Sequence, residues 1–124
     1  MRILVVEDNR DIAVNLGDYL EDRGHTVDYA ADGVTGLHLA VANDFDAIVL
    51  DLNLPGMDGL EAIRRIRADK RFLKLPIIAI TAKAMKDDQE RCLQAGSNDY
   101  LAKPIDLDRL FSLIRVWLPK MERI

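Results

Sequence analysis

The stretch AIVLDLNLPGMDG, residues 47–59, decides the fold of this chain. It begins as a continuous apolar run, reaches Asp51, and passes at once into a turn-rich segment that contains Pro55 and Gly56. A run that is apolar at every position is typical of a strand buried on both faces, as in a parallel sheet covered by helices. Asp51 is therefore expected at the open end of a buried strand, where a carboxylate can act as a nucleophile.

Apolar runs of this kind alternate with segments of helical periodicity along the whole chain. The runs lie near residues 2–7, 25–30, 46–51, 76–80 and 98–102, and the helical segments near 9–23, 33–43, 59–70, 84–95 and 106–118. Capping residues agree with this division: helix starts are expected at Asp32, Asp58 and Asp106, and helix ends at Gly24, Asn43 and Gly96. The alternation predicts an α/β fold with a single doubly wound, five-stranded parallel sheet flanked by five helices.

Length and composition indicate one globular domain. The 124 residues are 49% hydrophobic and 31% charged, which suits a single core and is too little for two. We assign residues 1–118 to this domain and residues 119–124 to a short C-terminal tail or the start of a linker. The single cysteine, Cys92, cannot form an internal disulfide, and no apolar run approaches the roughly 20 residues of a membrane helix. A cytoplasmic location without membrane contact is expected.

The charge balance argues against nucleic acid as a direct ligand, because the net charge is −4. One basic stretch shares its segment with apolar residues at helical spacing; it contains Arg64, Arg65, Arg67, Lys70 and Arg71. We interpret this stretch as the solvated face of an amphipathic helix rather than a nucleic-acid patch.

Polar residues also end three of the other apolar runs. Glu7 and Asp8 follow the first run, Thr81 follows the fourth, and Lys103 follows the fifth. Because the carboxyl ends of parallel strands meet at one edge of the sheet, these side chains are expected to converge with Asp51.

The expected cluster of Glu7, Asp8 and Asp51 places like charges together, and such a cluster is stable with a cation between them. Oxygen ligands without a nearby His or Cys favour Mg²⁺, with Mn²⁺ as a substitute. The backbone carbonyl of Asn53, in the turn after Asp51, is a further candidate ligand. The sequence therefore predicts a divalent metal site at this edge.

Lys103 and Thr81 add the groups that a phosphoryl transfer requires. An ammonium and a hydroxyl, together with Mg²⁺, neutralise three phosphoryl oxygens during in-line attack by Asp51. This set of residues predicts the formation of an aspartyl phosphate.

These residues, in this order, resemble the receiver domain of two-component response regulators, the superfamily of chemotaxis receivers. The resemblance covers the whole chain and rests on the pair Glu7-Asp8, on Asp51 within IVLDLNLPGMDG, on Thr81-Ala82, and on Asp99-Tyr100 through Lys103-Pro104. It implies a flavodoxin-like sheet with strand order 2-1-3-4-5. It also implies that Asp51 is the phosphoacceptor, that Glu7, Asp8, Asp51 and the Asn53 carbonyl hold Mg²⁺, and that Thr81 and Lys103 bind the phosphoryl group.

The resemblance further implies a switch and its partners. Tyr100 would change rotamer with Thr81, and the Lys103-Pro104 bond would be cis. The phosphoryl group would come from a histidine kinase or a histidine phosphotransfer protein. The face formed by residues 84–95, 98–102 and 106–118 would then control a partner, an output domain or a homodimer. Such a domain is not a conventional enzyme, since it catalyses only its own phosphorylation and autodephosphorylation. No output domain follows residue 124, so we expect a receiver that acts alone or a piece of a longer regulator.

Other classes of protein are less consistent with the sequence. A haloacid-dehalogenase-like phosphatase needs a second aspartate where this chain has Asn53, and a flavodoxin-like carrier needs a phosphate loop rich in Ser, Thr and Gly where this chain has Glu7-Asp8-Asn9-Arg10. A metal-free pseudo-receiver would lack acidic or Lys positions that are all present. Tyr100 also fits a simple packing role, and His25 and His38 lack partner ligands.

Overall fold

The computed structural model describes residues 1–82 and 85–118. Strands and helices alternate in the order β1 (Arg2–Val6), α1 (Arg10–Glu21), β2 (Thr26–Ala30), α2 (Gly33–Ala42), β3 (Ala47–Asp51), α3 (Gly59–Ala68), β4 (Ile77–Thr81), α4 (Lys86–Ala95), β5 (Asp99–Ala102) and α5 (Leu107–Trp117). A short 3₁₀ helix, η1 (Lys70–Phe72), lies between α3 and β4. The predicted alternation of strands and helices is confirmed.

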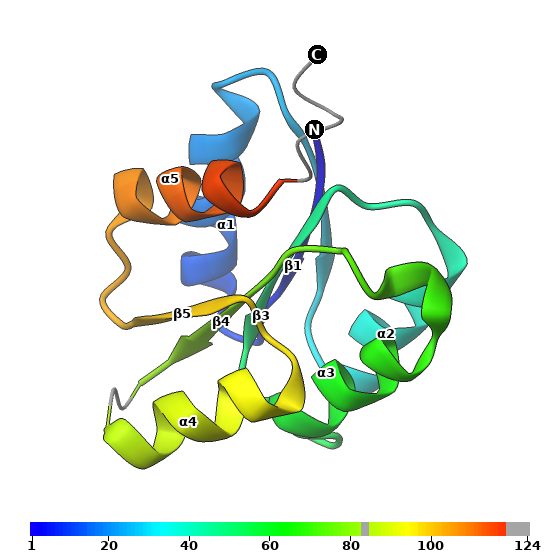
Figure 1. Ribbon diagram of the computed structural model, residues 1–124. Coiled ribbons are helices and arrows are strands. Elements are labelled where there is room, and N and C mark those ends of the chain that lie inside the picture. Colours follow the sequence, from blue (N-terminus) through cyan, green and yellow to red (C-terminus); the bar gives the residue numbers. More distant parts are fainter. Residues whose placement is uncertain (83–84, 119–124) are drawn as a thin grey trace.

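The strands form one parallel sheet in the order β2-β1-β3-β4-β5, as the resemblance implied. Asp51 at the end of β3 is level with Ile80 in β4, and Thr81 at the end of β4 is level with Ala102 in β5. The carboxyl ends of the central strands therefore lie along one edge of the sheet (Figure 1).

Helices cover both faces of the sheet. Figure 1 shows α1 and α5 on one side and α2, α3 and α4 on the other. Side chains alternate along β3: Ile48 and Leu50 pack in the core with α2 and α3, whereas Val49 packs in the core with α1 and α5. Every residue of β3 is buried, which explains why its sequence is apolar up to Asp51.

Polar caps set most helix boundaries. Asp32, Asp58 and Asp106 each accept a backbone N–H at a helix start, as predicted. Asn9 caps α1 in the same way, although the sequence analysis did not name it. Gly96, with a φ of 124°, ends α4.

Several predicted boundaries differ from the structure by one or two residues; the helix expected over residues 9–23, for example, ends at Glu21. The helix expected over residues 59–70 ends at Ala68, because Asp69 is extended and its carboxylate accepts the N–H of Arg71 to start η1. The helix expected from residue 84 is described from Lys86 onward, and the predicted tail at 119–124 lies outside the described residues. Within the described part of the chain, no helix is long and apolar enough to cross a membrane.

Candidate functional site

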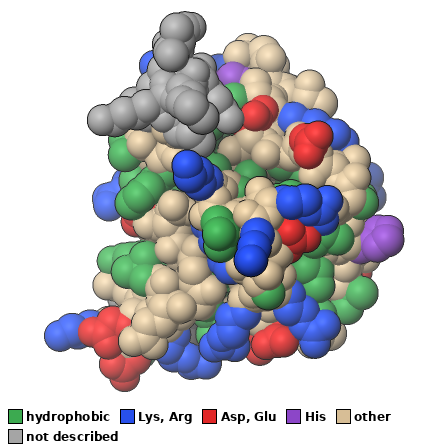
Figure 2. Space-filling view, turned by 45° about the vertical axis from the view of Figure 1, so that its right-hand side comes forward, with side chains coloured by type: hydrophobic (Ala, Val, Ile, Leu, Met, Phe, Trp, Pro, Cys, Tyr) green, Lys and Arg blue, Asp and Glu red, His purple; other side chains and the backbone are tan. Residues whose placement is uncertain are grey.

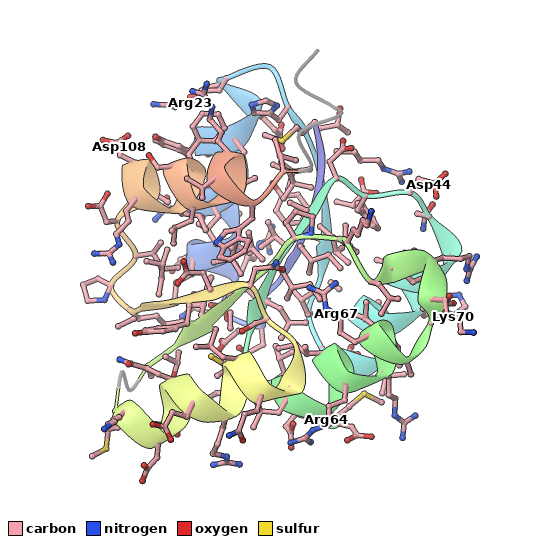
Figure 3. The ribbon with its side chains drawn as sticks, viewed as in Figure 1. Arg23, Asp44, Arg64, Arg67, Lys70 and Asp108 are labelled. Atoms are coloured by element: carbon pink, nitrogen blue, oxygen red, sulfur yellow. The ribbon has the colours of Figure 1, made fainter. Side chains whose placement is uncertain are left out.

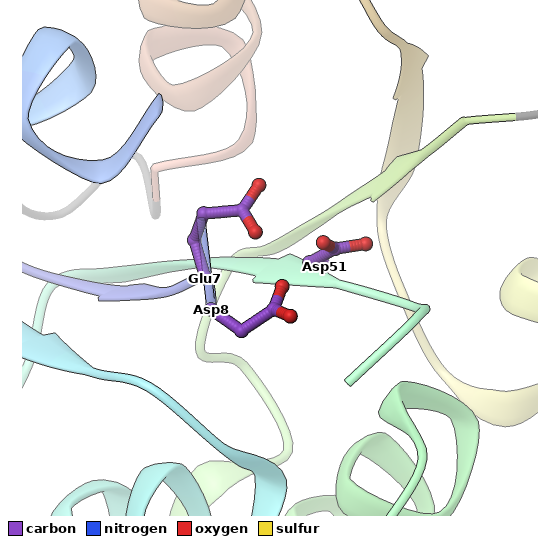
Figure 4. A group of neighbouring side chains, drawn as sticks. All are labelled: Glu7, Asp8 and Asp51. Carbon is purple, nitrogen blue, oxygen red and sulfur yellow. The ribbon is translucent and has the colours of Figure 1, made fainter. Parts of the chain in front are cut away.

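Three carboxylates gather at the carboxyl edge of the sheet, as the sequence predicted (Figure 4). Glu7 follows β1 directly, Asp51 closes β3, and one ligand atom from each of Glu7, Asp8 and Asp51 lies within 4.8 Å of the others. Glu7 and Asp51 are buried, with 3% and 1% of their surface exposed, whereas Asp8 is exposed. The cluster is therefore anchored inside the protein and open to solvent on one side.

Lys103 connects two of these carboxylates. Its Nζ lies 2.9 Å from Oδ2 of Asp51 and 2.8 Å from Oε1 of Glu7. The residue follows β5, two strands away from β3, and its peptide bond to Pro104 is cis, as the resemblance implied. The fold thus brings together a cation and two buried anions that are far apart in the sequence.

Burial makes Glu7 unusual among the acidic residues. It raises the pKa of Glu7 to about 7, and the nearby Asp51 acts in the same direction, while Lys103 and the backbone N–H of Asn9 oppose the shift. Oε1 of Glu7 is buried without a well-aligned hydrogen bond, even though the ammonium of Lys103 is close enough for an ion pair. The single ammonium of Lys103 therefore does not satisfy all the hydrogen-bond acceptors of these carboxylates.

The ammonium of Lys103 responds to the same environment. Burial alone lowers the pKa of Lys103, but hydrogen bonds and charge interactions with Glu7 and Asp51 outweigh burial and raise it. Lys103 therefore remains positively charged at neutral pH and offers a fixed charge beside Asp51.

The residues present suit a hard divalent cation. All ligand atoms of the cluster are carboxylate oxygens, and an additional positive charge would satisfy the buried Oε1 of Glu7. Mg²⁺ commonly binds through one or two carboxylates and keeps several waters, which the exposure of Asp8 permits. Glu7, Asp8 and Asp51 could together hold such an ion.

Asn53 contributes a contact that the sequence analysis did not foresee. Its backbone N–H donates to Oδ1 of Asp51 at 3.0 Å, so that the turn after β3 orients the carboxylate. The signal in the sequence was the turn itself, because residues two positions after an aspartate often donate to it. The role of the Asn53 carbonyl as a metal ligand stays a prediction.

A cleft of about 430 Å³ opens beside this edge, between the β3–α3 loop and α4. Thr81 is buried at the end of β4 and lines the cleft together with Asn53. Asp88 and Arg91 of α4 line it as well, although no motif in the sequence marked them. Residues of the carboxyl edge and of α4 therefore face the same cleft.

Tyr100 lies in β5, level with Ala79 of β4, and is half-buried. The structure does not bring it into the acidic cluster, so its switch role stays a prediction. Nδ1 of His25 accepts a hydrogen bond from the N-terminal ammonium at 2.9 Å, far from the site in the fold, and Cys92 is a buried packing residue of α4.

The basic stretch of α3 and η1 is mostly a solvated face. Arg65 and Arg71 pair with the acidic residues Glu61 and Asp69 at 3.0 and 2.7 Å. Figure 2 shows Lys and Arg side chains interspersed with Asp and Glu on the side that is turned forward. For Arg67 this interpretation is wrong. Its guanidinium points into the protein and donates to three oxygens, because α3 turns this residue toward α4.

Comparison with known proteins identifies the family. The model of the response regulator receiver domain matches residues 3–115. The chain belongs to this family. Receiver domains of response regulators are phosphorylation-dependent switches of two-component signalling. The family resemblance, the fold and the general function that the sequence suggested are therefore confirmed.

Several bacterial relatives are similar over most of this chain. It is 38% identical over 118 residues to the transcriptional regulatory protein HprR of Escherichia coli. The aligned region covers 95% of this chain and 52% of that protein. It is 41% identical over 115 residues to the transcriptional regulatory protein TcrA of Mycobacterium tuberculosis. Here the aligned region covers 93% of this chain and 45% of that protein. The chain spans about half the length of the curated relatives that it matches.

Solved structures agree in fold. The receiver domain of the sensor histidine kinase PA1611 of Pseudomonas aeruginosa, which has a magnesium ion coordinated in its active site cleft, superposes with a TM-score of 0.86 at 42% identity and covers 94% of this chain and 95% of that one. The chemotaxis response regulator CheY4 of Vibrio cholerae gives a TM-score of 0.88 at 28% identity and covers 94% of this chain and 98% of that one.

Proposed function

We propose that this domain accepts a phosphoryl group on Asp51 in the presence of Mg²⁺ and thereby changes the surface that it presents to a partner. The observation that carries the proposal is the placement of Lys103, whose Nζ lies within 2.9 Å of both Asp51 and Glu7 at the edge where Asp8 is exposed. This arrangement leaves a nucleophilic carboxylate between a fixed cation and a candidate metal site.

The chemistry is an in-line displacement. An Oδ atom of Asp51 forms a bond to phosphorus as the bond between phosphorus and a donor histidine nitrogen breaks. The electron pair of the broken bond stays on that nitrogen. Because the other ring nitrogen carries a proton, the histidine is released as a neutral imidazole. Lys103 and the hydroxyl of Thr81 stabilise the phosphoryl oxygens, and the N–H of Asn53 orients Asp51. Bound Mg²⁺ would offset the remaining negative charge.

The donor is a histidine kinase or a histidine phosphotransfer protein. A groove of about 610 Å³ supports this choice, because it lies between α1 and the segment after β5 and begins at Lys103 itself. Its lining is largely apolar, with Ile12 and Leu16 on one side and Pro104 and Ile105 on the other. A helix that docks there would bring a phosphohistidine to the carboxyl edge.

The partner recognises the face formed by α4, β5 and α5. A phosphoryl group adds roughly −1.5 to −2 charge beside Thr81, which draws the hydroxyl toward Asp51 and leaves space for Tyr100 to turn inward. The partner is an output domain, another protein or a second copy of this chain, in the cytoplasm. Attack of water on phosphorus then returns Asp51 as a carboxylate and releases inorganic phosphate, so the domain also catalyses its own dephosphorylation.

Intact-mass measurement with acetyl phosphate tests the proposal. With Mg²⁺ the wild type should gain one phosphoryl group, and chelation of the metal should prevent the gain. Asp51→Asn should gain none, whereas the control Asp44→Asn, at an exposed position in the α2–β3 loop, should behave as wild type. Equal labelling of the Asp51 variant would contradict the assignment.

A further inference from the structure

Arg67 ties the C-terminal end of α4 to two other parts of the protein. Its Nε donates to the carbonyl oxygen of Gly96 at 2.8 Å, Nη1 to that of Phe72 at 2.6 Å, and Nη2 to Oδ1 of Asn98 at 2.8 Å. The same Oδ1 accepts the N–H of Ile77, the first residue of β4, at 2.8 Å. One guanidinium thus links α3, η1, the start of β4 and the α4–β5 turn.

The turn itself is built around this contact. Gly96 has a φ of 124°, a conformation that side chains disfavour, and a Cβ atom there would lie 2.6 Å from Cγ of Arg67. The N–H groups of Gly96 and Ser97 both donate to the carbonyl oxygen of Cys92, which closes the end of α4. This end of the helix is therefore held by its own backbone and by Arg67.

The N-terminal end of α4 has fewer stabilising contacts among the residues that the structure describes. Its N-cap, Met85, makes no side-chain cap hydrogen bond and is 65% exposed, whereas an Asn or Asp caps each of the other α-helices in the described part of the chain. The buried residues of α4 are Cys92 and Ala95, both in its C-terminal half. The first half of the helix therefore has no fully buried residue, and we expect it to be displaced more easily than the second half.

The weakly held end is also the end that meets the functional site. Asp88, in the first turn of α4, and Arg91 line the cleft that Thr81 and Asn53 line from the sheet. Figure 3 shows Arg67 pointing from α3 toward the strand that follows α4, at the opposite end of the helix, while Arg64 lies at the surface. The cleft beside the carboxyl edge of the sheet thus lies at one end of α4, and the contacts of Arg67 lie at the other.

We propose that Arg67 is a positioning residue that fixes the C-terminal end of α4, so that phosphorylation moves this helix at its N-terminal end about a pivot at Gly96. The inference rests on the proposed function for its trigger, but the unequal anchoring of α4 belongs to the unmodified protein. The partner that reads the α4 face would then sense residues 86–91 more than residues 92–95.

Amide hydrogen exchange and chemical shifts of the whole chain, measured by NMR, test this proposal. Without any ligand, the amides of Gly96, Ser97 and Asn98 should exchange about tenfold or more slowly than those of Glu90 and Arg91. With Mg²⁺ and beryllium fluoride, shift changes should be large over residues 86–91, small over 96–98, and should leave exchange at 96–98 within about twofold. In Arg67→Met, exchange at 96–98 should accelerate about tenfold and the shift changes should reach them, whereas the exposed control Arg64→Met should match wild type.

Each other outcome has a distinct meaning. Uniform exchange along α4, or uniform shift changes along it, would overturn the pivot even if residues around Asp51 respond. An Arg67→Met profile equal to wild type would overturn the role of Arg67. A complete lack of response around Asp51 would refute the proposed function, and the phosphorylation-driven movement with it. If Arg67→Met does not fold, the wild-type profile and Arg67→Lys, which keeps the charge with fewer donors, still decide the matter.

Discussion

A cationic side chain lies at each end of β5, and the charges that surround the two cations differ. At the carboxyl end, Lys103 lies between the buried carboxylates of Glu7 and Asp51, and Asp8 adds a third. At the amino end, Arg67 donates to carbonyl and amide oxygens and has no carboxylate partner among the residues that the structure describes. The first site has more negative charge than its cation can balance, while the cation of the second donates to three neutral acceptors.

This difference matches the roles proposed for the two ends. A surplus of buried negative charge is unfavourable unless a further cation binds, which supports the metal and phosphoryl chemistry that we propose for the carboxyl end. The half-buried guanidinium of Arg67 donates to three oxygens of the protein itself and so holds segments together.

The largest effect is expected from removing the cation at the carboxyl end. Lys103→Met should slow phosphorylation of Asp51 by acetyl phosphate by about 100-fold or more, because the phosphoryl oxygens lose a preorganised positive charge. Lys70→Met, on the exposed surface of η1, is the matched control and should retain the wild-type rate. Rates from time-resolved intact mass, at saturating Mg²⁺, provide the comparison; a less than threefold change, roughly, would remove Lys103 from the mechanism.

Removing the cation at the other end should affect stability instead of chemistry. Arg67→Met should lower the free energy of unfolding by about 2–3 kcal/mol, since Gly96, Phe72 and Asn98 lose a charged donor. Arg64→Met should change it by less than about 0.5 kcal/mol, because Arg64 is exposed and its pairing with Glu61 is at the surface. Urea unfolding of both variants measures the difference, and equal midpoints would contradict the structural role of Arg67.

The surplus charge at the carboxyl end should appear as a pH dependence of stability. The folded protein keeps a proton on Glu7 between the ordinary value of 4.5 and about 7, whereas the unfolded chain loses it. The folded state therefore binds more protons in this window, and stability without metal should fall as pH rises through it, by about 1–3 kcal/mol.

Glu7→Gln isolates that contribution, since it removes the titrating group. The difference in unfolding free energy between wild type and Glu7→Gln should change between pH 4.5 and 7 and become level above pH 7. Saturating Mg²⁺ should reduce the fall in the wild type, because the ion favours the carboxylate. A difference that stays constant across the window would show that Glu7 titrates normally.

The smallest effect is expected from giving Arg67 a counter-charge. Asn98→Asp keeps an oxygen where Oδ1 accepts from Arg67 and Ile77 and turns the contact into an ion pair. It should stabilise the protein by about 1 kcal/mol, because charge-assisted hydrogen bonds are stronger than neutral ones. Thermal unfolding detects such a change, and a loss of stability would mean that desolvation of the new carboxylate dominates.

The two ends of β5 also differ in how much the sequence revealed. The carboxyl end was predictable because parallel strands share an edge, so that Glu7, Asp51 and Lys103 had to converge once the strands were recognised. The amino end was not, because Arg67 shares its segment with exposed arginines and nothing in the local pattern shows which one faces α4. The Asn53 N–H contact and the cleft residues Asp88 and Arg91 likewise depend on loop and helix placement.

The role of Asp51 is tested most directly by locating the modification. The protein is incubated with acetyl phosphate and Mg²⁺, the acyl phosphate is reduced with borohydride, and peptides are mapped by mass spectrometry for the resulting homoserine. Homoserine is expected at residue 51 alone, with none when the metal is chelated. Reduction products at Glu7 or Asp8 instead, or a labelled protein with an intact Asp51, would contradict it.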